Sequence, residues 1–139
     1  MRNVSKVCVR NTTDSVIKFE ERRSVARFHN PERRAYKRVQ VDGCALTEGE
    51  KCDNMLCSED EHEERYVELK GSDVLHAIDQ LRTTIQKLGE YDGNRSSYVV
   101  CTKVAPLYTT MIQLAKREFK ARFNSSLDVT KTPLEVSLY

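Results

Sequence analysis

Two carboxylates and one lysine stand at a spacing that would let them share a metal site. Glu68 and Lys70 belong to residues 65–70 (RYVELK), a short run that predicts a β-strand. Because side chains alternate along a strand, Tyr66, Glu68 and Lys70 should point to one face of it. Fourteen residues separate Glu68 from Asp53, which lies on the preceding predicted strand. A hairpin that pairs these two strands would bring both carboxylates and the lysine together at one edge of a sheet.

Oxygen ligands of this kind suit a hard divalent cation. Mg²⁺ typically takes one or two carboxylates and completes its coordination with water and substrate phosphate. Such an ion lowers the pKa of a coordinated water and stabilises negative charge on a phosphate. A neighbouring lysine can orient that water or neutralise developing charge. The residue types therefore predict a site for Mg²⁺, or for Mn²⁺ in its place.

The surrounding elements would position this site. Residues 37–46 and 51–57 predict two strands, and the polar residues 58–64 predict the hairpin loop before the strand at 65–70. Short polar turns join these three runs, so they should form an antiparallel meander. A helix capped by Ser72 or Asp73 should follow, because an apolar stripe recurs at helical spacing: Val74, Ala77, Ile78, Leu81, Ile85 and Leu88.

The second half of the chain predicts one more strand and one more helix. Residues 97–104 form an apolar run that should lie parallel to the strand at 65–70, since a crossover helix separates the two. A helix from Pro106 to about Phe123 should turn one face inward: Leu107, Met111, Leu114, Ala115 and Phe119. Residues 4–28 fit neither the alternation of a strand nor the spacing of a helix and stay unassigned. Residues 129–139 predict an edge strand.

These elements predict a single α/β (α+β) domain over residues 1–139. Its core should span about residues 37–122 and contain a central mixed sheet flanked by helices, in the order βββαβα.

The pattern of Asp53, fourteen residues, and then Glu68-Leu69-Lys70 resembles the PD-(D/E)xK superfamily. That group includes restriction endonucleases, Holliday-junction resolvases and many DNA-repair nucleases. The resemblance covers roughly residues 39–104 and implies a restriction-endonuclease-like core in the order (α)βββαβα. Two positions depart from the family pattern. Cys52 stands where proline is common, and only Glu20 and Glu21 are candidates for the acidic residue of the family's first helix.

The resemblance also implies roles for individual residues. Asp53, Glu68 and the backbone carbonyl of Leu69 would bind the metal, Lys70 would assist the nucleophilic water, and Gln80 on the following helix would act as a further catalytic residue. The implied activity is metal-dependent hydrolysis of phosphodiester bonds, in DNA rather than RNA. Two alternatives stay open: a catalytically inactive nucleic-acid-binding module of the same fold, and a protein-interaction domain.

The charged residues are unevenly distributed although the net charge is only +2. Residues 48–64 are strongly acidic, and basic residues gather before them and in the last predicted helix. A basic surface can track the phosphates of a nucleic acid, although solvated or ion-paired residues would give the same pattern. The predicted phosphate-binding set is Arg22, Arg23, Arg27, Arg33, Arg34, Lys37, Arg38, Lys116, Arg117, Lys120 and Arg122.

The cysteines and the hydropathy bear on compartment and on metal choice. The five cysteines are an odd number, and residues 1–10 lack the apolar stretch of a signal peptide, so we expect reduced thiols in a cytoplasmic protein. No apolar run is long enough to span a membrane, and a homodimer stays open. A zinc site is the competing interpretation, although its spacings are irregular; its ligands would be Cys44, Cys52, Cys57 and His62.

Overall fold

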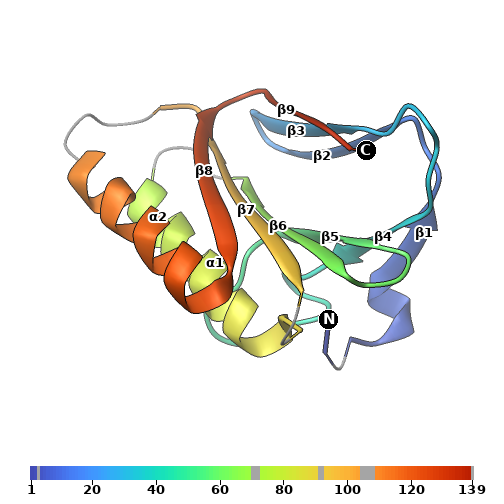
Figure 1. The fold of residues 1–139 in the computed structure, drawn as a ribbon, viewed down its shortest axis with the longest axis horizontal. Helices are drawn as coiled ribbons and strands as arrows, with labels where there is room; N and C mark the ends of the chain where they lie inside the picture. Colours follow the sequence, from blue (N-terminus) through green and yellow to red (C-terminus); the bar gives the residue numbers. More distant parts are fainter. Residues whose placement is uncertain (3, 70–72, 91–92, 104–108, 139) are drawn as a thin grey trace.

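The computed structural model describes residues 1–2, 4–69, 73–90, 93–103 and 109–138, which form an α+β fold around a mixed sheet (Figure 1). The elements before the first long helix are η1 (Lys6–Cys8), β1 (Val9–Thr12), β2 (Val16–Glu21), β3 (Ser24–His29), β4 (Tyr36–Gln40), β5 (Asn54–Ser58) and β6 (Glu63–Leu69). They are followed by α1 (Val74–Leu88), β7 (Asn94–Cys101), α2 (Thr109–Phe123), β8 (Ser125–Lys131) and β9 (Leu134–Ser137).

The central strands have the topology that the sequence predicts. β4, β5 and β6 form an antiparallel meander, and β7 lies parallel to β6 after the α1 crossover. β1 and β8 complete the sheet in the order β1-β4-β5-β6-β7-β8. Asn54 pairs with Val67, so the residues just before β5 lie beside the last residues of β6.

Two predicted strands are shorter than their apolar patterns suggested. The strand predicted at residues 37–46 ends at Gln40, because Asp42 and Gly43 form a turn in which Gly43 has φ of 76°. A positive φ is easy for glycine and breaks the extended ladder. The strand predicted at residues 51–57 begins only at Asn54, so Asp53 precedes β5.

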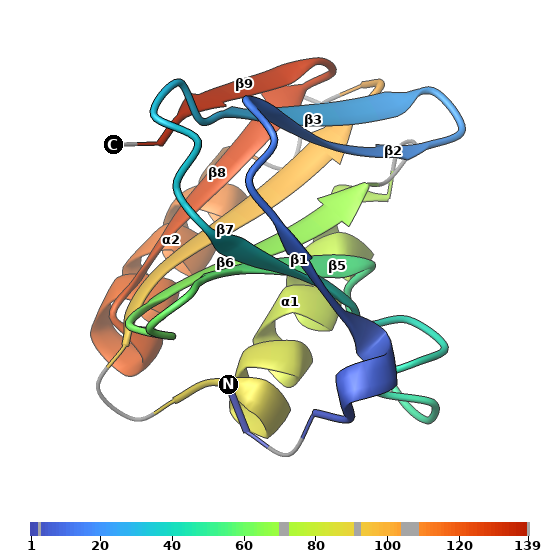
Figure 2. The same cartoon turned by 90° about the vertical axis from the view of Figure 1, so that its right-hand side faces the viewer.

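The unassigned residues 4–28 form η1, β1 of the main sheet, and the strands β2 and β3, which belong to a second, three-stranded sheet. The order of that sheet is β2-β3-β9, with β3 parallel to β9 (Figure 2). Its apolar residues pack on one face of the main sheet; this cluster contains Ile17, Phe19, Phe28, Leu56, Val67 and Leu134. The single edge strand predicted at residues 129–139 corresponds to parts of two strands. β8 lies at the edge of the main sheet, and β9 belongs to the second sheet.

The helices cover the opposite face of the main sheet (Figure 1). The whole predicted stripe of α1 is buried, and the Asp73 side chain caps the helix by accepting a 3.1 Å hydrogen bond from the His76 amide. The predicted inward face of α2 is wrong at Met111 and Leu114, which are 52% and 58% exposed. The buried face instead follows a stripe set by Ile112, Ala115, Phe119 and Phe123. Neither α1 nor α2 has the length and apolar character needed to cross a bilayer.

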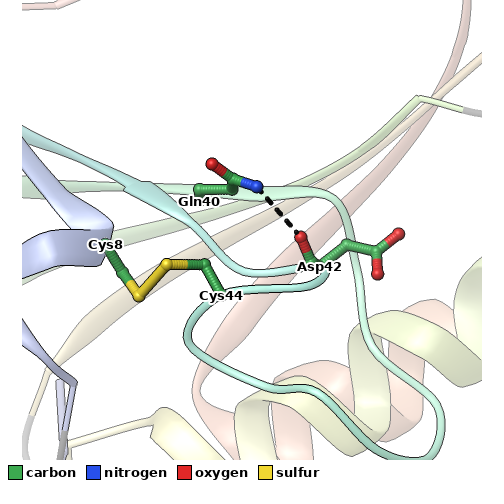
Figure 3. The surroundings of a disulfide bond; sticks show 4 residues. All are labelled: Cys8, Gln40, Asp42 and Cys44. Atoms are coloured by element: carbon green, nitrogen blue, oxygen red, sulfur yellow. Dashed lines mark hydrogen bonds between the residues drawn. A yellow bond between two sulfur atoms is a disulfide. The ribbon is translucent and has the colours of Figure 1, made fainter.

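A disulfide joins Cys8 to Cys44 and overturns the expectation of reduced cysteines (Figure 3). It ties the end of η1 to the turn at residues 41–46, where the Gln40 side-chain amide donates a 3.3 Å hydrogen bond to the Asp42 carbonyl. The sequence did not indicate this pair, because 36 residues separate the two cysteines. Disulfides are uncommon in a reducing cytosol, so a cytoplasmic location stays a prediction.

Candidate active site

Asp53 and Glu68 meet where β5 begins and β6 ends. The Asp53 amide donates a 3.0 Å hydrogen bond to Glu68 Oε1, and the Leu69 amide donates a 2.9 Å hydrogen bond to Asp53 Oδ2. Each carboxylate thus accepts from the backbone of the neighbouring segment. The β5–β6 register explains this exchange, because it places the residue before Asn54 next to Glu68. The structure therefore brings together the two carboxylates that the sequence singles out.

The side chains of β6 alternate as predicted. Tyr66 packs in the core beneath the helices, whereas Val67 and Leu69 pack against the second sheet. Glu68 is 1% exposed, and an ionised carboxylate at that depth is costly unless charges or hydrogen bonds compensate it. A carboxylate at this depth is not part of a surface ion pair on an exposed strand.

A pocket of about 390 Å³ opens at this point. Asp53, Glu68 and Leu69 line it together with Gln80 of α1. The tip of the β2–β3 hairpin and two further segments complete the wall: Glu21, Arg22, Arg23, Ser24, Asp42 and Thr102. A larger hollow of about 770 Å³ lies at the far end of β5 and β6, around Arg34 and the acidic loop that joins these two strands. The smaller pocket is the candidate site, because the carboxylates of the partly buried Asp53 and the buried Glu68 converge on it.

Burial and neighbouring carboxylates change the acidity of Asp53. The pKa of Asp53 is raised from 3.8 to about 7, mainly by burial; the hydrogen bond from the Leu69 amide works against this rise, and the nearby Glu21 and Asp42 carboxylates add to it. A divalent cation would relieve this repulsion, since it compensates several negative charges at once. The donor set therefore fits a hard cation such as Mg²⁺.

This raised pKa predicts how stability depends on pH in the absence of metal. The folded protein holds the Asp53 proton more tightly than the unfolded chain, so its stabilising contribution is complete below about pH 4 and is lost as pH rises through 7. Asp53→Asn should therefore raise the melting temperature at pH 8, and the gain should shrink as pH falls toward 4. Thermal unfolding with EDTA between pH 4 and 8 measures this, and a gain independent of pH would contradict the assignment.

Gln80 lines the pocket, and its side chain binds the backbone of the segment before Asp53. Its Nε2 donates a 3.1 Å hydrogen bond to the Lys51 carbonyl. Its Oε1 is buried and has no hydrogen-bond partner among the described residues. Lys70, the third member of the predicted set, falls outside those residues.

Glu21 and Asp42 are pocket residues that sequence reasoning did not place. Glu21 was only a candidate for an acidic residue on a helix, and the structure instead puts it at the end of β2. The Asp42-Gly43 turn signal was present in the sequence, but the predicted strand ran through it. Both positions depend on contacts between distant segments, which periodicity does not reveal.

The predicted basic set does not form one surface. Arg22 and Arg23 lie on the β2–β3 hairpin, whereas Lys116, Arg117, Lys120 and Arg122 lie on α2, across the main sheet. Arg33 and Arg34 lie between β3 and β4, and Arg34 borders the larger hollow. Only Arg22 and Arg23 of this set line the pocket of the two carboxylates.

Several other members of the set have intramolecular partners. Arg27 pairs with Glu135 at 2.9 Å, and Lys37 pairs with Glu61 of the acidic loop at 3.1 Å. Arg38 donates a 2.6 Å hydrogen bond to the Lys18 carbonyl and lies over the Phe19 ring. These contacts favour a structural role for Arg27, Lys37 and Arg38 over a role in phosphate binding.

The cysteines proposed as zinc ligands are not available to bind the ion. Cys44 is in the disulfide, and Cys52 and Cys57 both pack in the core beneath the helices rather than on opposite faces. Burial raises the pKa of the Cys52 thiol and brings that of Cys57 to about 12, which disfavours the thiolate that zinc requires. Within the described residues, no group of three or more His, Cys, Asp and Glu side chains is arranged to hold a metal. The proposed magnesium site has two carboxylates, with a backbone carbonyl, water and substrate as its remaining ligands.

Comparison of the chain with protein-family models, curated proteins and solved structures finds no match.

Proposed function

We propose that this protein is a magnesium-dependent nuclease that hydrolyses phosphodiester bonds, with DNA rather than RNA as its substrate. The observation that carries the proposal is the meeting of the Asp53 and Glu68 carboxylates in a pocket that two arginines also line. The choice of DNA rests on the resemblance of Asp53, Glu68 and Lys70 to the PD-(D/E)xK pattern, and is an analogy.

Each residue has a role in this proposal. Asp53, Glu68 and the Leu69 carbonyl would hold the cation. When bound, Mg²⁺ lowers the pKa of water and neutralises charge on the phosphate. Lys70 orients the attacking water, and Gln80 contributes a side-chain amide at the pocket wall. Arg22 and Arg23 attract the phosphate backbone, because guanidinium groups can bind phosphate through two parallel hydrogen bonds.

The charge distribution favours approach from the β2–β3 hairpin. Before a cation binds, the pocket carboxylates supply no positive charge that could attract a polyanion. The acidic loop at residues 59–64 lies at the opposite end of β5 and β6, away from the site. Arg22 and Arg23 therefore supply positive charge beside the site itself.

The first test of the proposal is cleavage. The protein should degrade DNA in Mg²⁺ or Mn²⁺ and should be inactive in EDTA. Linear, circular, single-stranded and branched DNA, with an RNA control, would define the substrate. Failure to cleave any of them in the presence of either metal would contradict the proposal.

The reciprocal hydrogen bonds of Asp53 and Glu68 favour one second candidate. They would also stabilise a catalytically inactive nucleic-acid-binding module, because they need no cation to form. Salt-dependent DNA binding without cleavage would identify that function.

Charge reversal at the hairpin tip predicts a change in salt dependence. Arg22→Glu/Arg23→Glu should weaken DNA binding and flatten the log–log salt slope by about 0.9 for each phosphate that the variant no longer neutralises. The matched control is Arg117→Glu/Lys120→Glu, an equal charge change on the exposed face of α2. Fluorescence anisotropy at several salt concentrations measures both. Equal effects of the two double variants would indicate that only net charge matters.

A further inference from the structure

The segment that carries Asp53 lies before the strand ladder of β5 and is held by backbone and side-chain hydrogen bonds together. Residues 51–53 precede β5, yet the Asp53 carbonyl accepts hydrogen bonds from the amides of Val41 at 3.1 Å and Asp42 at 3.3 Å. The Asp53 amide donates to Glu68 Oε1. These bonds fix the residue from the β4 and β6 sides, and the remaining side of the segment faces α1.

Two side chains of α1, one helical turn apart, form hydrogen bonds with the backbone of this segment. Thr84 Oγ1 accepts a 2.8 Å hydrogen bond from the Cys52 amide and donates one of 2.8 Å to the Gln80 carbonyl. The Gln80 side chain donates to the Lys51 carbonyl at 3.1 Å. Gln80 and Thr84 thus bind consecutive residues immediately before Asp53.

Thr84 is unusual among the residues that α1 buries. It is 0% exposed and sits in a stripe of Ala77, Ile78, Leu81, Ile85 and Leu88, where an apolar side chain of the same size would ordinarily be expected. A hydroxyl can donate and accept at once, so it satisfies the Cys52 amide and its own hydrogen together. Valine has the same shape but would leave the buried Cys52 amide without this acceptor.

We propose that Thr84, with Gln80, is a positioning residue that fixes residues 51–53 and thereby sets the place of the Asp53 carboxylate. This inference rests on the proposed metal site. Mg²⁺ demands nearly ideal octahedral geometry, so a small displacement of one carboxylate lowers its affinity. Groups that hydrogen-bond around metal ligands typically change metal affinity about 10–100-fold when they are removed.

The test uses Mn²⁺ alone as the probe, in calorimetry on the full chain. Thr84→Val should weaken Mn²⁺ binding about 10–100-fold. Thr84→Ser should bind Mn²⁺ with the wild-type affinity, because serine keeps the hydroxyl. Ser97→Ala is the matched control, since Ser97 is buried and its hydroxyl lies 2.8 Å from that of Ser125, away from the pocket lining. Ser97→Ala should lower the melting temperature but keep the wild-type Mn²⁺ affinity.

The outcomes separate this inference from the proposed function. If the wild type binds Mn²⁺ and cleaves DNA, and Thr84→Val does both equally well, the positioning role is wrong while the nuclease proposal stands. If Thr84→Val does not fold, Gln80→Met removes the other hydrogen bond from a partly exposed side chain. Unchanged Mn²⁺ affinity in that variant would overturn the inference. A wild type that neither binds Mn²⁺ nor cleaves DNA would overturn both proposals.

Discussion

Asp53→Asn and Glu68→Gln should each abolish metal-dependent DNA cleavage, with losses of about 10³-fold or more in kcat/KM. Each substitution removes one negative ligand and keeps an oxygen that can accept the observed hydrogen bond. The amide oxygen at position 53 can still accept from the Leu69 amide, and that at position 68 can accept from the Asp53 amide. Steady-state cleavage of labelled DNA measures the effect.

These neutral substitutions separate chemistry from folding. Both variants should show cooperative thermal unfolding, because their backbone hydrogen bonds can persist. Alanine at position 68 is the less informative change, since it would leave the Asp53 amide without its carboxylate acceptor. Wild-type turnover in either folded amide variant would show that the two carboxylates do not bind the catalytic ion.

Lys70→Ala should reduce kcat about 10²–10³-fold while Mn²⁺ affinity stays at the wild-type level. The reason is chemical, because an ammonium group acts on water and phosphate and is not a ligand for a cation. Cleavage kinetics and calorimetry on the same preparation measure the two quantities. Lys120→Ala, which removes an exposed lysine from α2, is the control and should change neither.

Two results would contradict the role given to Lys70. A wild-type kcat in Lys70→Ala would show that Lys70 takes no part in the reaction. A loss of Mn²⁺ affinity equal to that of Asp53→Asn would instead indicate that the substitution disrupts the metal site.

Local patterns predicted β6, which carries Glu68, and β5, which begins directly after Asp53. Strand alternation placed Tyr66 and Glu68 on one face of β6, and helical spacing identified the buried stripe of α1. The short β5–β6 hairpin then limited the pairing register, so the approach of Asp53 to Glu68 followed from nearby residues. A parallel β7 followed from the crossover helix.

The remaining features depend on contacts between distant segments. Glu21 reaches the pocket only because the β2–β3 hairpin packs over the main sheet, and that packing needs β9 from the other end of the chain. The Cys8–Cys44 disulfide likewise joins segments that no local pattern relates. The basic residues were grouped by sequence position, but strands and helices distribute them over different surfaces. Thr84 carried no sequence signal, since its partner is a backbone amide of a distant segment.

Mn²⁺ in crystals of the wild-type protein, located by anomalous diffraction, tests the central claim most directly. The proposal predicts an anomalous peak at coordination distance from the Asp53 and Glu68 carboxylates and the Leu69 carbonyl, and no such peak in Asp53→Asn. A site saturated with Mn²⁺ elsewhere on the chain, with none between Asp53 and Glu68, would contradict it.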